Sequence, residues 1–418
     1  MRFPAVLTVS VLVVATLAAS PTGPATADPA DGPGARASTR QITYAQWDSG
    51  DQWRRGTLSG VRVGNGRLLI KSPEGQRRYE GRRYDAAHWD SPWVRPGFDL
   101  TRLIASWSAT TPGDSWVEVR VRGRNHSGST SSWDVLGRWA SGDRYLKRRT
   151  VSGQGDDLAD VNVDTWETRG LRTYQLRVTL LRRAGASYTP SLDTVGAMAS
   201  RLPVGAGPTS RPGPAAGTRL DVPRFSQMTH SGHYPRWGDG GQAWCSPTST
   251  SMVLAYYDAL PPRRAYAWVG DNHPDPWVDH AARMTFDYDY DGAGNWPFNT
   301  AYAAPLAGKA FVTRLRSMRE AERFIVAGIP LVASISFGPG ELDGAPISST
   351  SGHLLVIAGF TNDGDVVVND PAAATRAGVR RVYDRGQLER AWLAASGGTT
   401  YVIRDKAHPL PGGTHTNW

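Results

Sequence analysis

The 418-residue sequence predicts a multidomain protein, with an all-β domain of sandwich or jelly-roll-like type followed by an α+β domain. Residues 41–200 contain short runs in which apolar and polar residues alternate, as they do in half-buried strands. Residues 201–218 are rich in Pro and Gly without apolar periodicity, which is typical of an interdomain linker. From 219 to 410, helical spacing comes first and strand-like runs follow. Residues 411–418 remain as a short tail rich in Gly and polar residues.

The N-terminus has the pattern of a secretory signal peptide. Arg2 precedes an apolar run over 6–19, and the small residues Ala25-Thr26-Ala27 follow it. We therefore expect residues 1–27 to be a signal peptide, residues 28–40 to be a flexible lead-in, and the protein to be secreted. We expect no transmembrane segment, because no later run approaches the roughly 20 apolar residues that a membrane span needs.

The strands expected in the first domain include 117–122, 176–180 and 68–70, separated by clusters of Gly, Pro, Asp and Ser. Many short strands with turn signals between them favour a β-sandwich or jelly roll. In the second domain, Ser-Pro opens a predicted helix over 246–260, and a second helix is expected over 317–327. Strands are expected after it, at 331–337, 354–360, 365–368 and 400–404.

The net charge of +9 comes from the N-terminal half of the chain. Residues 1–219 hold 30 Lys and Arg against 19 Asp and Glu, whereas residues 220–418 hold 17 against 19. A basic exported domain suits an anionic polymer or an acidic glycan, although a well-solvated Arg-rich surface explains the charge equally well. We expect no nucleic-acid partner, because the sequence has no recognisable motif for one. The Trp residues before position 201 include Trp89, Trp93, Trp116, Trp133 and Trp139. We expect most of them to pack in the core, and the alternative is that they form a glycan-binding platform.

The sequence has one cysteine, Cys245, so no internal disulfide can form. Cys245 directly precedes Ser246-Pro247, at the N-terminus of the predicted helix. Unpaired backbone N–H groups and the helix dipole favour negative charge there, and therefore the nucleophilic thiolate. We interpret Cys245 as a nucleophile rather than as a buried structural thiol.

A nucleophilic thiolate needs a base and a group that orients the base. His353 stands at the start of one predicted strand, and Asp370 stands at the end of the next. Asn362-Asp363-Gly364 is a strong hairpin turn between them, which brings His353 and Asp370 within about two residues of facing each other. A hydrogen bond between the imidazole and the carboxylate is therefore feasible. The alternative is structural, with His353 bonded to backbone and Asp370 forming a turn.

Four segments resemble cysteine peptidase family thirty-nine, in the order in which that family has them. They are LDVPRFSQ at 220–227, WCSPTSTSMVLAYY at 244–257, GHLLVIAGF at 352–360 and VVVNDPA at 366–372. The resemblance covers the second domain and implies a papain-like fold with Cys245 as nucleophile, His353 as base and Asp370 as orienting carboxylate. It points to Gln227 for the oxyanion hole, with Gln242 as the alternative. Ser246 departs from the family pattern, because a Gly usually follows the family's Cys, and the insert between Gln227 and Cys245 is long.

These observations predict a secreted cysteine peptidase or amidase that is a monomer and has no cofactor. The expected substrate is a peptide or a protein, including one that is associated with the cell wall. One alternative is a non-catalytic cell-wall or glycan binding protein whose papain-like domain has lost its activity. Another keeps the site and transfers the acyl group to an amine instead of water. We assign the substrate-binding residues to segments beside the expected site; they are Gln242, Trp244, Asn295 and Trp296, of which the last two are expected in a loop.

Two further patterns suggest metal sites only weakly. Asp287, Asp289 and Asp291 imitate the start of an EF-hand loop, but Phe298 stands where that loop requires Glu. His230 and His233 have no third ligand at a plausible spacing in the sequence. The sequence therefore predicts no metal.

Overall fold

The computed structural model describes residues 39–155, 157–270 and 272–418, which all belong to one compact unit. The predicted signal peptide and all but the last two residues of the lead-in lie outside these residues. The described chain is mostly β, with antiparallel sheets and few helices. None of the helices in these ranges is long and apolar enough to cross a membrane.

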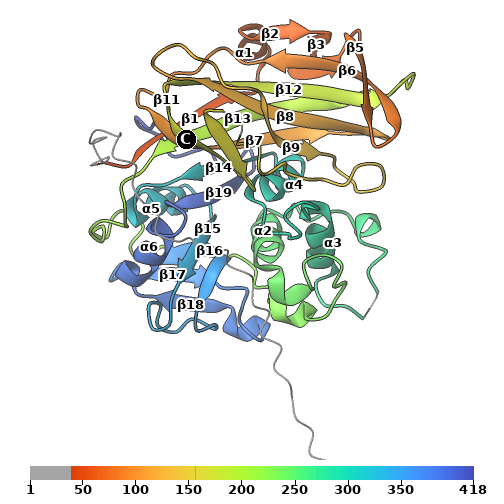
Figure 1. The fold of residues 1–418 in the computed structure, drawn as a ribbon. Helices are drawn as coiled ribbons and strands as arrows, with labels where there is room; N and C mark the ends of the chain where they lie inside the picture. The colour runs from red at the N-terminus through yellow and green to blue at the C-terminus, as the bar shows by residue number, and fades with distance from the viewer. Residues whose placement is uncertain (1–38, 156, 271) are drawn as a thin grey trace, which may run out of the picture. The chain divides into compact units, whose positions relative to one another are not determined.

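The N-terminal part is a β-sandwich of two antiparallel sheets (Figure 1). The first sheet has strands β1 (Gln41–Trp47), β3 (Val61–Gly64), β4 (Arg67–Ile70), β7 (Leu100–Thr110), β10 (Ala159–Asn162), β11 (Thr165–Leu171) and β13 (Ser191–Arg201). The second has β2 (Thr57–Ser59), β5 (Gly75–Tyr79), β6 (Arg82–Asp90), β8 (Ser115–Arg124), β9 (Asp134–Trp139) and β12 (Thr173–Arg183), and the short helix α1 spans Gly50–Arg54. The three strands expected at 117–122, 176–180 and 68–70 are confirmed as parts of β8, β12 and β4.

Tryptophan side chains fill much of the sandwich core. Trp89, Trp116 and Trp139 are buried, so these three pack in the interior and do not offer a sugar-stacking surface. Trp93 and Trp133 are half-buried. The Arg122 guanidinium lies 5.2 Å from the centre of the Trp93 ring and 4.4 Å from that of Trp133, which covers part of both rings.

The C-terminal part combines one antiparallel sheet with helices. Among the described residues its strands run in the order β14 (Lys309–Arg314), β19 (Thr399–Arg404), β15 (Leu331–Phe337), β16 (Thr350–Phe360), β17 (Val366–Asn369) and β18 (Arg380–Tyr383). Its helices are α2 (Cys245–Tyr256), α3 (Pro276–Thr285), α4 (Trp296–Ala307), α5 (Met318–Val326) and α6 (Arg385–Leu393). Figure 1 shows α5 and α6 on one side of this sheet and α2 on the other.

Alternation along the strands explains how the sheet is covered on both faces. On β15, Val332 belongs to the apolar cluster that contains residues of α2, whereas Leu331 and Ala333 belong to the cluster that contains residues of α5 and α6. Successive residues of a strand point to opposite faces, so a run of apolar residues is buried on both. This explains why the run at 354–360 is apolar throughout and why only Ser334 and Ser336 interrupt the run at 331–337.

Three helices of the C-terminal part, α3, α4 and α6, were not expected from the sequence. The segment over 276–285 forms α3, and the segment from Trp296 forms α4 instead of the predicted loop. Asn295 is the N-cap of α4, where its side chain accepts a hydrogen bond from the Phe298 backbone N–H at 3.0 Å. The residues of α4 are buried on nearly all sides, so the sequence carries no amphipathic pattern that would reveal it.

The sandwich and the C-terminal part are joined by buried contacts as well as by the chain. The Thr150 hydroxyl donates to Asp287 Oδ2 at 2.8 Å, and the guanidinium of the fully buried Arg148 donates to the backbone carbonyl oxygen of Arg283 at 2.5 Å. Phe298 of α4 lies in the apolar core of the sandwich. These contacts fix α3 and α4, and with them one side of the region around Cys245.

After Arg201, which ends β13, the predicted linker has no helix or strand, yet contacts hold it in place. The Ser210 backbone N–H donates to Glu389 at 2.6 Å, and Ala215 is fully buried. The tail is also ordered by contacts, because Asn417 is buried and donates to the Arg314 carbonyl oxygen at 2.8 Å. The Thr416 carbonyl oxygen accepts from the Tyr44 backbone N–H in β1 at 2.6 Å, so the C-terminus contacts the first strand of the sandwich.

Candidate functional site

Cys245 is the first residue of α2, as the sequence predicts, and its side chain is half-buried. Trp244 anchors the start of this helix: it is fully buried, and its carbonyl oxygen accepts from the Thr248 N–H at 3.0 Å. From Ser246 to Leu254 every residue is buried, so the helix is embedded and its N-terminus is held in place. The backbone N–H groups of the first helical turn have no partner within the helix and are available to an anion beside Cys245.

The predicted contact between His353 and Asp370 is present in the structure. His353 lies in β16 and Asp370 directly follows β17, and their Nε2 and Oδ1 atoms are 2.8 Å apart. The pairing of Val356 with Asn369 in this hairpin leaves His353 and Asp370 two residues from facing each other, which agrees with the count from the turn. Both side chains are buried, with 3% and 1% of their surfaces exposed.

The second oxygen of Asp370 has a partner that the sequence did not reveal. Tyr383, the last residue of β18, donates its hydroxyl to Asp370 Oδ2 at 2.7 Å, and the Ala372 N–H donates to Oδ1 at 3.0 Å. Both carboxylate oxygens are therefore occupied, which fixes the plane of the group. Tyr383 is fully buried at the far end of the next hairpin, and no motif in the sequence links it to Asp370.

Burial and charge act in opposite directions on this pair. Burial alone would lower the pKa of His353, but the charge and hydrogen bond of Asp370, together with the hydrogen bond to Cys245, raise the pKa of His353 from 6.5 to about 10. Burial would raise the pKa of Asp370, but the charge of His353 and the hydrogen bonds from His353 and Tyr383 hold it below its usual 3.8. Burial and the adjacent Asp370 raise the pKa of Tyr383, which therefore stays a neutral donor. The geometry favours an imidazolium–carboxylate pair at neutral pH.

The Cys245 side chain lies close enough to the imidazole of His353 to help raise the pKa of His353. Since Nε2 faces Asp370, the other ring nitrogen, Nδ1, is the one available to the thiol. The helix and the sheet meet at this point, because the Ser249 hydroxyl of α2 donates to the Leu354 carbonyl oxygen at 3.0 Å. The three residue types therefore lie in the order thiol, imidazole and carboxylate.

Of the two glutamines, Gln227 is linked more directly to Asp370 by hydrogen bonds. It is buried, its N–H donates to the carbonyl oxygen of Pro371, next to Asp370, at 2.9 Å, and its Nε2 donates to the Gln242 carbonyl oxygen at 2.6 Å. The Gln242 side chain is exposed and is used within its own loop, where Nε2 donates to the Asp239 carbonyl oxygen at 2.6 Å. The segment that ends in Gln227 is held by Asn369, whose Nδ2 donates to the carbonyl oxygens of Val222 and Pro223.

Three residues assigned to substrate binding have structural contacts instead. Trp244 is fully buried and its indole N–H donates to the Trp237 carbonyl oxygen at 2.6 Å, so its side chain does not line an open cleft. Asn295 is buried, caps α4 and donates to Asp287 at 2.9 Å. Trp296 is the first residue of α4, and its N–H donates to Asp164 at 3.0 Å.

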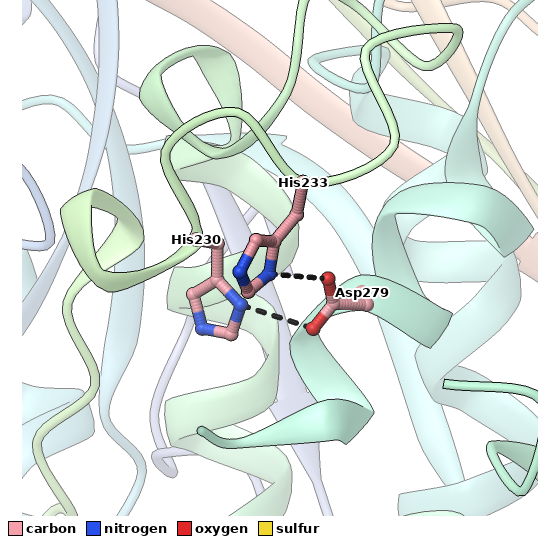
Figure 2. A group of neighbouring side chains, drawn as sticks. All are labelled: His230, His233 and Asp279. Carbon is pink, nitrogen blue, oxygen red and sulfur yellow. Dashed lines mark hydrogen bonds and ion pairs between the residues drawn. The ribbon is translucent and has the colours of Figure 1, made fainter. Parts of the chain in front are cut away.

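His230 and His233 have a third potential metal ligand that their spacing in the sequence does not reveal. It is Asp279 of α3, which lies 49 and 46 residues further along the chain, and one oxygen of its carboxylate faces each ring (Figure 2). The spacing in the sequence concealed this cluster, because the residues come from separate elements. Asp287 of the EF-hand-like pattern is instead buried and accepts from Thr150 and Asn295.

Comparisons with known proteins identify both parts of the chain. Residues 43–200 match the Peptidase C39 N-terminal domain, and residues 219–400 match the Peptidase_C39 like family. The C-terminal part is therefore a peptidase C39-like domain, preceded by the N-terminal domain of the same group. This relates the protein at family level to peptidases. A comparison with curated proteins gives no match.

Two solved structures are similar to the chain only weakly. One is a family two carbohydrate esterase from Cellvibrio japonicus, at 11% identity and a TM-score of 0.20, with 52% of this chain and 50% of that chain covered. The other is a glycosylation-associated protein complex from Streptococcus agalactiae, at 13% identity and a TM-score of 0.19, with 41% and 48% covered. The chain spans about half the length of each.

Proposed function

We propose that the protein is a cysteine peptidase or amidase with a papain-like catalytic domain, in which Cys245, His353 and Asp370 perform the chemistry. The observation that carries this proposal is the contact between His353 and Asp370, with the thiol on the other side of the imidazole. A thiol at a helix N-terminus, a base and a group that orients the base form the arrangement that covalent acyl transfer requires. Membership of the peptidase C39-like family supports the same reaction class.

The proposed reaction has two halves. The Cys245 thiolate attacks the carbonyl carbon of an amide, the C–S bond forms, and the oxygen takes up the negative charge. His353 gives its Nδ1 proton to the amide nitrogen while the C–N bond breaks, and the amine leaves. His353 then takes a proton from water, whose oxygen attacks the thioester and releases the acid and the Cys245 thiolate.

The oxyanion would be bound by the backbone N–H of Cys245 and by the side chain of Gln227. One N–H of the Gln227 amide is used by the Gln242 carbonyl oxygen, and the second remains for a ligand. Gln242 fits this role less well, because its amide is exposed and bonded within its loop. Asp370 holds the His353 ring in the tautomer that the reaction needs, and Tyr383 holds Asp370.

A non-catalytic binding protein is the second candidate, and two features favour it, Ser246 and the long insert before Cys245. The Ser246 hydroxyl lies 2.8 Å from that of Tyr401, and both are buried. The extra hydroxymethyl group, where the family usually has Gly, is therefore accommodated in the interior beneath the helix. This contact favours the catalytic proposal over the binding one.

We further propose that the protein is secreted and that its substrate is a peptide or protein, with the basic N-terminal domain contacting an anionic polymer. The Trp residues buried in the sandwich core reduce the aromatic surface available for glycan stacking, so charge is the better basis for such contact.

The experiment that tests the function is a digest of a diverse peptide library with the protein and with its Cys245→Ala variant. New peptide termini that form with the wild type and not with the variant would support the proposal, and trapping of the acyl group by an added amine would indicate transfer. If the wild type produces no more new termini than Cys245→Ala and forms no thioester with an activated acyl donor, the catalytic proposal is wrong and the non-catalytic binding protein is the function that stands.

A further inference from the structure

A cluster of imidazole and carboxylate groups lies outside the proposed catalytic residues, where the insert between Gln227 and Cys245 meets helix α3. His230 Nδ1 lies 3.0 Å from Asp279 Oδ2, and His233 Nδ1 lies 3.0 Å from Asp279 Oδ1. Figure 2 shows both rings pointing at one carboxylate from the same loop, with Asp279 approaching from helix α3. The three candidate ligand atoms lie within 4.8 Å of one another.

We propose that His230, His233 and Asp279 bind a divalent first-row transition metal ion, with zinc as the best fit. Zinc takes nitrogen and oxygen ligands at about 2.0–2.2 Å in tetrahedral geometry, so neighbouring ligand atoms lie about 3.3 Å apart. The two N···O distances of 3.0 Å are close to that spacing. Imidazole with carboxylate suits zinc and its neighbours, whereas calcium and magnesium require oxygen ligands.

A further imidazole, that of His273, lies beside the cluster. Its Nδ1 lies 2.9 Å from His233 Nδ1, and the two ring centres are 3.9 Å apart. His233 Nδ1 thus faces both the Asp279 carboxylate and the His273 nitrogen, although a neutral imidazole nitrogen offers either one proton or one lone pair. A proton on His233 Nδ1 can serve only one of these two neighbours, whereas a cation bound to its lone pair is attracted by the Asp279 carboxylate as well.

The surroundings are those of a protected site. Asp279 and His230 are fully buried, and 20% of the His233 side chain is exposed. Aromatic rings enclose the cluster: the Trp244 ring lies 6.2 Å from that of His230, and the Tyr234 ring stacks on His273 at 5.7 Å. An apolar shell of this kind restricts water and strengthens binding of an ion to its ligands.

The position of the cluster defines what the ion would do. His230 ends the short helix η1 (Gln227–His230), and His233 begins the loop that leads to Cys245. Asp279 lies in the middle of α3, which contacts the sandwich through Arg283 and Asp143 at 2.8 Å. The ion would fasten the insert to α3, which is a structural role. The proposal does not depend on catalysis by Cys245.

The test is titration of the metal-free protein with Zn²⁺ by calorimetry and with Co²⁺ by visible absorption. We expect one ion per chain, the intense d–d bands of tetrahedral Co²⁺, and a rise in Tm of about 3 °C at a hundredfold excess of zinc over Kd. His233→Gln and Asp279→Asn should each raise Kd by at least about 10–100-fold, since even changes beside a ligand cost that much.

Two control variants separate this cluster from other donors. His408→Gln removes a histidine that contacts a carboxylate elsewhere, Asp405 at 2.7 Å, and should bind zinc as the wild type does. Cys245→Ala should also bind normally, which excludes capture of the ion by the thiol. If Asp279→Asn does not fold, His233→Gln, which replaces a ligand whose side chain is 20% exposed, should still lower the affinity. Absence of stoichiometric binding, or binding that survives His233→Gln and is lost in Cys245→Ala, would overturn the proposal.

Discussion

Replacement of Asp370 by Asn removes one charge from a buried pair and leaves an oxygen that can still accept from His353 Nε2. The imidazole then stays buried without the carboxylate that keeps it protonated, so the pKa of His353 should fall from about 10 to below 6.5. Breaking a buried ion pair lowers the free energy of unfolding by about 3–5 kcal/mol. Because Asn retains a hydrogen bond to His353, we expect a loss near the lower end of that range. With a urea slope of about 3 kcal/mol per M, the unfolding midpoint should fall by about 1 M at pH 6.

The loss of unfolding free energy in Asp370→Asn should depend on pH in a defined direction. The raised pKa of His353 means that its contribution is complete below pH 6.5 and is lost as the pH rises through about 10. The lowered pKa of Asp370 means that its contribution is present above 3.8 and is lost as the pH falls through its folded value. The difference between wild type and Asp370→Asn should therefore be largest between about pH 4 and 6.5 and should shrink toward pH 10.

The assay is urea unfolding, followed by tryptophan fluorescence at pH 6 and pH 9.5. Asp363→Asn is the matched control, because Asp363 is exposed in the turn of the same hairpin and its replacement should change stability by less than about 0.5 kcal/mol. An equal midpoint shift for Asp370→Asn at both pH values would refute the reasoning, since it would show that His353 is not charged by Asp370.

Three other predictions concern single contacts. Tyr383→Phe removes the hydroxyl bonded to Asp370 and should cost about 1.5–3 kcal/mol in urea unfolding; an unchanged midpoint would mean that the bond does not matter. Thr150→Val removes a donor from a buried carboxylate of the C-terminal part and should cost a similar amount, so stability equal to the wild type would contradict the inferred contact. Gln227→Ala should lower kcat on a cleaved peptide by about a hundredfold or more, whereas Gln242→Ala should leave it within a few-fold; the reverse order would exchange their roles.

Local patterns were sufficient for the strands expected at 331–337, 354–360, 365–368 and 400–404 and for the hairpin that carries His353 and Asp370, but not for β14 and β18. The strand at 331–337 has the predicted bounds, and α2 begins at Cys245, one residue before the predicted start. Both follow from short-range rules: apolar runs bounded by turn residues, and a helix that opens at Ser-Pro. The pairing of His353 with Asp370 follows from one turn and a count of residues along two strands.

Contacts between distant segments were outside the reach of those rules. Helix α4 is buried on nearly all sides and begins at Trp-Pro, so it lacks the polar face by which surface helices are found. Tyr383 reaches Asp370 through a second hairpin, and Asp279 reaches His230 across 49 residues. Each of these depends on how whole elements pack against one another, which no spacing within one segment records.

The measurement that tests the central claim most directly is the pH dependence of Cys245 alkylation by iodoacetamide in the wild type and in His353→Ala. Because Cys245 is the only cysteine, the rate reports one thiol. The account predicts that the wild type is alkylated faster than the variant near neutral pH, because the charged imidazole of His353 favours the thiolate. Identical profiles for the two proteins, or a thiol inert in both, would contradict the claim that Cys245 and His353 form a nucleophilic pair.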